Sequence, residues 1–145
     1  VHARQGSFFA GIDDSFDCIL ANLPQEIIPP EYAKKLGKTA STIQGGNLGN
    51  EILLDFLKCV PNYMKSYTRL YVVVYGLTDF QATLNHISKN FSANLLEHRL
   101  VEPKHFVYDH IEHYRELRDR GIIYLKETSE GVYTSLSMFE LRLHS

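Results

Sequence analysis

The sequence predicts an α/β fold with a doubly wound sheet, parallel strands and a terminal antiparallel hairpin. Residues 70–75 (Leu-Tyr-Val-Val-Val-Tyr) are continuously apolar and rich in β-branched side chains, a pattern typical of strands covered on both faces. Helical patterns lie between the strand patterns, as parallel crossover connections require. Two strand patterns around a glycine-containing turn end the chain, which indicates an antiparallel hairpin.

The first half of the chain supplies one strand, a long loop and a helix. Residues 16–21 form a short apolar run between polar segments, which predicts a strand buried on both faces. Residues 24–50 carry three prolines and four glycines and predict a long loop with one helical turn at 31–36. Apolar residues at helical spacing follow Asn50, a suitable N-cap, and predict a helix over 52–60.

The second half continues the alternation after the strand at 70–75. Thr78 and Gln81 have the spacing of a capping box and predict a helix that ends near Asn90. The remaining elements are a strand at 93–101, a helix at 106–117 closed by Gly121, and hairpin strands at 122–127 and 132–143. We expect residues 1–145 to form a single, partial domain, in which 104–131 are a helical insertion and turn before the last strand.

Composition excludes several classes of protein. The 145 residues are 44% hydrophobic and carry a net charge of -2, so no global field attracts nucleic acid or an anionic membrane. Cys18 and Cys59 lie in apolar runs and predict reduced core thiols. No apolar run approaches the roughly 20 residues that span a bilayer. We expect a cytoplasmic protein without a membrane partner.

The end of the first strand is the predicted site of chemistry. Ligands of doubly wound sheets bind beyond the carboxyl ends of the strands, and Asn22-Leu23-Pro24-Gln25 occupies such an end. Pro24 stiffens the loop, and Asn22 offers uncharged donors and an acceptor that can hold an amine or amide in line with an electrophile. An ordinary strand-exit turn is the alternative interpretation of these four residues.

Residues 16–25 (Phe-Asp-Cys-Ile-Leu-Ala-Asn-Leu-Pro-Gln) resemble the strand and catalytic loop of class I S-adenosylmethionine-dependent methyltransferases that act on nitrogen. In that family a Phe-Asp pair opens an apolar strand that ends in Asn-Pro-Pro-Tyr or a variant. The branch that methylates glutamine in peptide release factors is similar further on, because Gly45-Gly46 follows the loop as its own Gly-Gly stretch does. The resemblance covers roughly residues 3–91.

The resemblance implies a methyltransferase that uses S-adenosyl-L-methionine to methylate a nitrogen of a protein or small molecule, without a metal. Asn22 would bind the target nitrogen, and the backbone of Leu23 and Pro24 would shape the pocket within an active-site loop over 23–50. Gln25 stands where the family has an aromatic residue, which favours a more polar acceptor. Ser7 and Phe8, in a turn like the one beside the cofactor's adenine, would contact the cofactor together with Asn22.

The family's cofactor cradle is missing from the pattern. The sequence shows neither a glycine-rich turn after a first strand nor an acidic residue at the end of a second strand. The resemblance therefore implies the C-terminal half of a Rossmann-like domain, inactive alone. Strand 16–21 would keep an unpaired edge, and we expect another copy of the chain or a complementary N-terminal fragment to cover it.

Three further interpretations stay open. Residues 106–143 could form a winged-helix element, but 104–145 hold six Lys and Arg against seven Asp and Glu, without the positive surplus that phosphate binding needs. Four histidines (His98, His105, His110 and His113) suit either a zinc site or a solvated polar face. A non-enzymatic scaffold is the third possibility.

Overall fold

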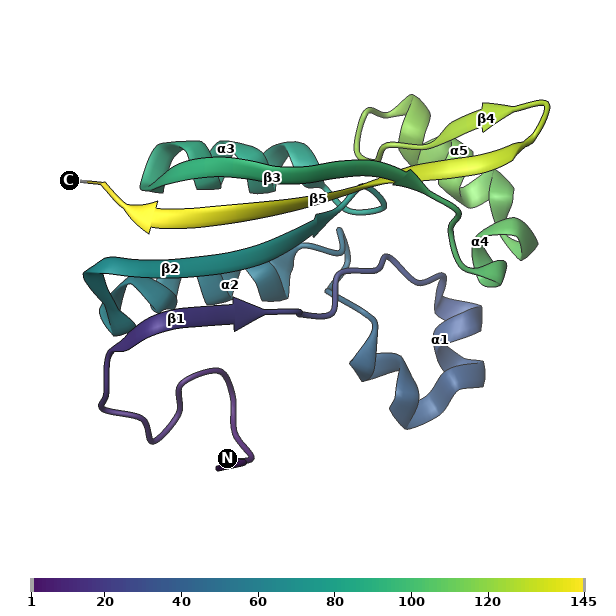
Figure 1. Ribbon diagram of the computed structural model, residues 1–145. Helices are drawn as coiled ribbons and strands as arrows, with labels where there is room; N and C mark the ends of the chain where they lie inside the picture. Colours follow the sequence, from purple (N-terminus) through teal and green to yellow (C-terminus); the bar gives the residue numbers. More distant parts are fainter. Residues whose placement is uncertain (1, 145) are drawn as a thin grey trace.

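The computed structural model describes residues 2–144. The elements, in chain order, are β1 (Phe16–Ala21), α1 (Pro30–Leu36), the 3-10 helix η1 (Gly37–Thr42), α2 (Glu51–Cys59), the 3-10 helix η2 (Val60–Tyr63), β2 (Met64–Tyr75), α3 (Phe80–Asn90), β3 (Phe91–Val101), α4 (His105–Asp109), α5 (Ile111–Asp119), β4 (Lys126–Thr128) and β5 (Gly131–Leu143). The helices α2 and α3 run along the sheet, whereas α1, α4 and α5 gather at one end of it (Figure 1).

The strands form one mixed, open sheet. Their order is β1-β2-β5-β3, and β4 also pairs with β5. β1 and β2 are parallel, and β5 runs antiparallel to both β2 and β3. β3 therefore points the same way as β1 and β2. The predicted α/β class, the parallel first pair and the antiparallel C-terminal pairing are confirmed.

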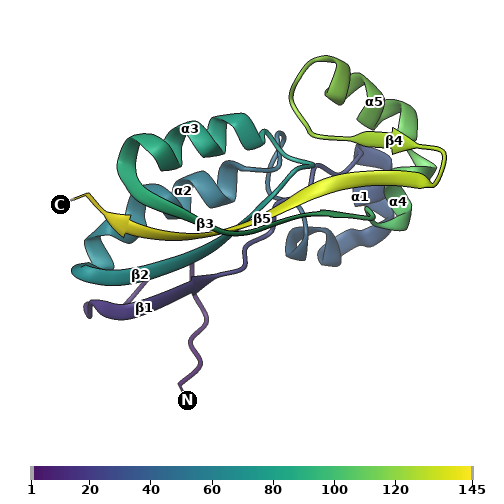
Figure 2. The ribbon, with the colours of Figure 1, turned by 45° about the horizontal axis from the view of Figure 1, so that its top comes forward.

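One face of this sheet is covered by α2 and α3 (Figure 2). The apolar residues of α2 recur at helical spacing, so that Leu53 and Leu57 both point into the core and are 1% exposed. They pack with Ile87 of α3 and with Leu70 and Val72 of β2 in one cluster. The predicted core face of the helix over 52–60 is confirmed.

The opposite face of β1 lies open, which corrects the prediction of a strand buried on both faces. Ile19 is buried on the helix side, but Leu20, on the other side, is 76% exposed. Cys18 is also exposed and both cysteines are free, so the prediction of two core thiols is wrong for Cys18. The reason is that side chains alternate along a strand and helices pack on only one side of this one.

Two predicted boundaries also differ from the structure. β2 begins at Met64 rather than near Leu70, because the first half of the strand pairs with the start of β1, where Phe16 lies opposite Met64. The helix α3 is capped by Asp79, whose Oδ1 accepts a hydrogen bond from the Ala82 amide at 3.0 Å. Thr78 instead donates to the Tyr75 carbonyl oxygen, so the predicted capping box is not formed.

The C-terminal helices and hairpin enclose a second hydrophobic cluster. The predicted helix over 106–117 is divided into α4 and α5 at His110, whose φ of -124° interrupts it. Both Ile123 and Leu125 turn into the second cluster, so only the three residues of β4 pair with β5. The predicted hairpin is present, with a shorter first strand.

None of the helices within residues 2–144 is long and apolar enough to cross a membrane.

Candidate functional site

A cavity of about 410 Å³ lies at the carboxyl ends of β1 and β2. Its walls come from the loop after β1, the end of η1, two strands and the β3–α4 segment. The lining residues are Asn22, Leu23, Pro24, Gln25, Glu26, Thr42, Ile43, Val73, Tyr75, Glu102, Lys104 and Leu136. All four residues of the predicted acceptor loop therefore line one cavity.

Gln25 anchors this loop to the sheet. Its side chain is 6% exposed, its Nε2 donates to the Val73 carbonyl oxygen at 2.7 Å, and its Oε1 accepts from the Tyr75 amide at 3.2 Å. The side-chain amide thus takes the place of a paired strand beyond Ala21, where β1 ends. Both polar atoms of the side chain form hydrogen bonds within the protein. Gln25 therefore positions the loop, and a ligand would contact the neighbouring residues instead.

The glycines that follow the loop hold it from the other side. Glu26 forms an isolated parallel bridge with Gln44, and the Gly45 amide donates to the Glu26 carbonyl oxygen at 3.1 Å. A Cβ on Gly45 would lie 2.7 Å from Gln25 Cα and 2.0 Å from the Gly49 carbonyl oxygen. Only glycine allows this close approach, which gives the glycine cluster a structural role beside the site.

Asn22 differs from Gln25 in its surroundings. It is exposed at the end of β1, and the described side-chain hydrogen bonds of this loop are made by Gln25 rather than by Asn22. Leu23 is half-buried and packs against the core beneath α2, while Pro24 fixes the intervening backbone. An amide with free donors and a free acceptor therefore stands on a rigid support at the rim of the cavity.

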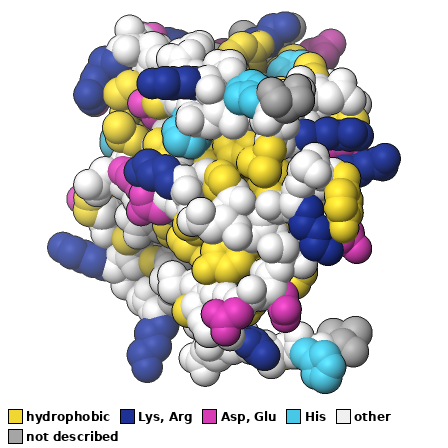
Figure 3. Space-filling model, turned by 90° about the vertical axis from the view of Figure 1, so that its left-hand side faces the viewer, with side chains coloured by type: hydrophobic (Ala, Val, Ile, Leu, Met, Phe, Trp, Pro, Cys, Tyr) yellow, Lys and Arg dark blue, Asp and Glu magenta, His cyan; other side chains and the backbone are white. Residues whose placement is uncertain are grey.

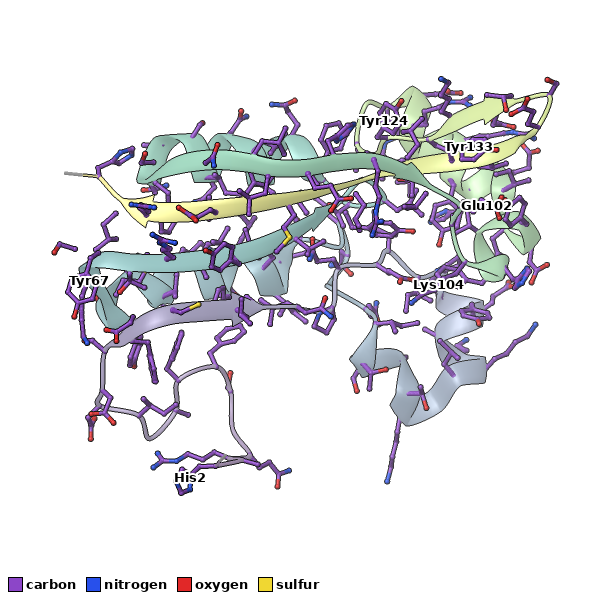
Figure 4. The ribbon with its side chains drawn as sticks, in the orientation of Figure 1. His2, Tyr67, Glu102, Lys104, Tyr124 and Tyr133 are labelled. Atoms are coloured by element: carbon purple, nitrogen blue, oxygen red, sulfur yellow. The ribbon has the colours of Figure 1, made fainter. Side chains whose placement is uncertain are left out.

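The charges of the cavity come from Glu26 and from the segment between β3 and α4, where Glu102 and Lys104 lie (Figure 4). Glu26 Oε1 is 2.5 Å from Lys104 Nζ, and the Glu26 side chain is 12% exposed. Glu102 is exposed and forms no ion pair with the residues described. Burial of the Tyr75 phenol raises its pKa, and the nearby Glu26 carboxylate raises it further, so the phenol stays protonated.

Sequence reasoning overlooked Glu26, Tyr75, Glu102 and Lys104. A usable pattern existed, because Glu102 directly follows the predicted strand at 93–101, as Asn22 follows the strand at 16–21. The carboxyl ends of strands that point the same way meet at one edge of a sheet. β5 is antiparallel to both β2 and β3, which establishes that β3 points the same way as β1 and β2; this pairing through β5 is not specified by a local sequence pattern.

The predicted cofactor residues do not all come together. Asn22 lines the cavity, but Ser7 and Phe8 do not. Phe8 instead packs edge-on against Phe56 with ring centroids 5.6 Å apart, and the adjacent Phe9 contacts Phe16, the first residue of β1. The turn thus lies near the amino end of β1, whereas Asn22 follows its carboxyl end.

Basic residues of the segment at 106–143, which was considered as a winged-helix element, pair with an acidic side chain of the same segment. Arg115 and Arg118 of α5 both bind the Glu127 carboxylate on β4, at 2.6 and 2.7 Å. At the end of the molecule shown in Figure 3, lysine and arginine side chains are scattered among hydrophobic and other groups. On α5 and β4, the Glu127 carboxylate therefore neutralises positive charge that phosphate binding would need.

The histidines do not assemble into a metal centre in the structure. Between residues 2 and 144, no group of three or more His, Cys, Asp or Glu side chains is placed to hold a metal ion. His98 Nδ1 instead lies 2.9 Å from the Ser137 hydroxyl on the neighbouring strand.

Comparison of the chain with protein-family models, curated proteins and solved structures finds no match.

Proposed function

We propose that Asn22-Leu23-Pro24-Gln25 is the acceptor-binding loop of an S-adenosyl-L-methionine-dependent N-methyltransferase. The observation that carries the proposal is the exposed Asn22 amide, held at the rim of a cavity at the carboxyl ends of two parallel strands. The resemblance of residues 16–25 to the family's strand and loop supports the same assignment. Gln25 and the Glu26–Gln44 bridge keep the loop in place without a ligand.

The chemistry that this loop offers is alignment. The Asn22 side-chain oxygen accepts a hydrogen bond from the acceptor's N–H, and backbone carbonyl oxygens near Pro24 can accept a second. Two such bonds direct the nitrogen lone pair into the cavity rather than toward solvent. Holding a nucleophile in one orientation lowers the barrier, because its orientational entropy is lost before the reaction. The proton that the methylated nitrogen releases can pass to solvent water at the rim of the cavity.

The residues expected to hold the cofactor do not fit it as one site, because Ser7 and Phe8 lie at the other end of β1 from Asn22. We therefore assign only the acceptor side to these residues. A second polypeptide, either another copy or a complementary N-terminal fragment, would complete the site. β1 is the terminal strand of the described sheet, and its exposed Leu20 leaves edge and face available for such a partner.

The experiment measures transfer of an isotope-labelled methyl group from S-adenosyl-L-methionine, with the protein and any polypeptide that co-purifies with it. We expect Asn22→Ala to lower the rate at least about tenfold, which corresponds to about 1.4 kcal/mol of lost alignment. Asn94→Ala is the matched control, because Asn94 is also exposed but lies on β3 outside the cavity. An unchanged rate in Asn22→Ala removes the proposed role.

A second measurement addresses the cofactor directly. Calorimetric titration with S-adenosylhomocysteine is run with the chain alone and with the co-purified polypeptide. We expect heat of binding only in the mixture. If the chain alone binds S-adenosylhomocysteine, the inference that it provides only the acceptor side of the site is contradicted. If neither sample binds, the methyltransferase proposal is contradicted.

A further inference from the structure

The cavity beside Asn22 shares part of its wall with a second cavity. Glu102 and Lys104 line both the 410 Å³ cavity and a neighbouring cavity of about 490 Å³, which also contains His105 and Tyr108. Because they share these two residues, the two spaces lie next to each other between Asn22 and the start of α4, and together they are called the groove. Two adjoining spaces can take successive residues of an extended chain, as peptide-binding surfaces do.

The charges that line the groove favour a cation. Lys104 is occupied by Glu26, with 2.5 Å between Nζ and Oε1, so their charges cancel. Glu102 remains as an exposed carboxylate with no ionic partner within residues 2–144. The nearest basic residue on the strand before it, Arg99, is 3.6 Å from Glu97.

The floor of the groove is apolar. Val73 of β2 and Leu136 of β5 line the first cavity. Val73 lies between the buried Val72 and Val74, so it points to the sheet face that α2 and α3 leave uncovered. Leu136 pairs with Tyr75, two residues further along β2, and therefore lies on the same face. A lysine or arginine side chain combines a hydrocarbon stem with a charged head. Its stem can lie along Val73 and Leu136 while its head reaches Glu102.

We infer that this groove, defined by Asn22, Val73, Glu102, Tyr108 and Leu136, binds an extended polypeptide segment that carries lysine or arginine. The inference is about binding, and the further step, that this segment is the methyl acceptor, rests on the proposed function. The protein would then act on a basic polypeptide segment, and an anionic acceptor such as RNA would be repelled by the Glu102 carboxylate.

The test is a binding titration by fluorescence anisotropy, without any methyl donor. The probe is a short labelled peptide of alternating lysine and glycine, and the comparison peptide has norleucine in place of lysine. We expect the lysine peptide to bind about fivefold more tightly than the norleucine peptide, because norleucine keeps the hydrocarbon stem and lacks the charge that meets Glu102. Glu102→Gln should weaken binding about fivefold, as expected for loss of one partly solvated ion pair.

Two further variants sharpen the test. Glu116→Gln is the matched control, because Glu116 is an exposed glutamate of α5 that lines neither cavity, and we expect no change. Lys104→Gln releases the Glu26 carboxylate into the groove, and we expect tighter binding, about twofold or more. No binding of the lysine peptide, equal effects of Glu102→Gln and Glu116→Gln, or tighter binding of polyuridylate would overturn the inference.

The outcomes separate this inference from the proposed function. If Asn22→Ala leaves methyl transfer unchanged while peptide binding still needs Glu102, the methyltransferase proposal fails and the peptide groove stands. If transfer to some other nitrogen compound needs Asn22 while peptide binding ignores Glu102, the peptide groove fails alone.

Discussion

The Gln25 side chain donates a 2.7 Å hydrogen bond from Nε2 to the carbonyl oxygen of Val73. Its Oε1 also accepts from the Tyr75 amide, so one side chain continues the β2 edge after β1 has ended. The position of the loop at residues 22–25 depends on these two hydrogen bonds. Its neighbour Asn22 remains free for a ligand because Gln25 makes the contacts with the sheet.

Gln25→Met keeps the packing volume and removes both hydrogen bonds. We expect the free energy of unfolding to fall by about 2–3 kcal/mol, because the Val73 carbonyl and Tyr75 amide lose their partners in a buried setting. Urea denaturation measures the change. Gln81→Met is the control, since the exposed Gln81 contacts only Asn85, and a comparable loss there would show that the contact with β2 is unimportant.

Gly45→Ala introduces a methyl group where backbone atoms of Gln25 and Gly49 lie within 3 Å of its position. We expect a loss of about 2–3 kcal/mol, because backbone must move to make room. Gly6→Ala is the matched control, as its Cβ would meet ordinary contacts from 3.5 Å. Thermal denaturation followed by circular dichroism compares the two, and similar melting temperatures would contradict the close approach.

Glu127 gives the structure a pH dependence of known sign. Its hydrogen bond from Arg115 lowers the pKa of the Glu127 carboxyl below its ordinary 4.5. The folded state therefore binds fewer protons, and the stabilisation is present above the unfolded pKa and lost as pH falls through the folded value. Unfolding free energies measured as a function of pH should fall less steeply in acid for Glu127→Gln than for the unmodified protein.

The same carboxyl can be followed directly. NMR titration of the Glu127 side chain should give a pKa below 4.5, and Arg115→Gln should move it upward because the largest cause of the shift is removed. An unchanged titration in Arg115→Gln would show that the ion pair is not formed in solution.

Leu20→Lys tests the open face of β1. Because Leu20 is 76% exposed, we expect the free energy of unfolding to change by less than about 0.5 kcal/mol in the chain alone. A second polypeptide seated on this face would bind the variant less tightly, as measured by analytical ultracentrifugation. Leu96→Lys, 46% exposed on β3, is the control, and equal association of both variants would place the partner elsewhere.

The order of strands and helices could be predicted because it depends on local patterns. The β-branched run at 70–75 and the spacing of Leu53 and Leu57 are features of neighbouring residues, and both elements are present in the structure. The loop at Asn22 could be located for the same reason, since the end of a strand is visible in the chain itself. The exact ends of the elements could not be predicted in the same way: the pattern pointed to Thr78 as the cap of α3, whereas Asp79 caps it.

The composition of the site required the tertiary structure. Glu102 and Lys104 reach the cavity only because β5 pairs with both β2 and β3, so that β3 points the same way as β1. Local sequence patterns do not predict which distant segments pair. Gln25 illustrates the same limit. The family resemblance implied that its position faces the acceptor, whereas its amide binds the β2 backbone. Local periodicity determines where strands and helices form. Long-range packing decides which polar groups form hydrogen bonds within the protein and which stay free for a ligand.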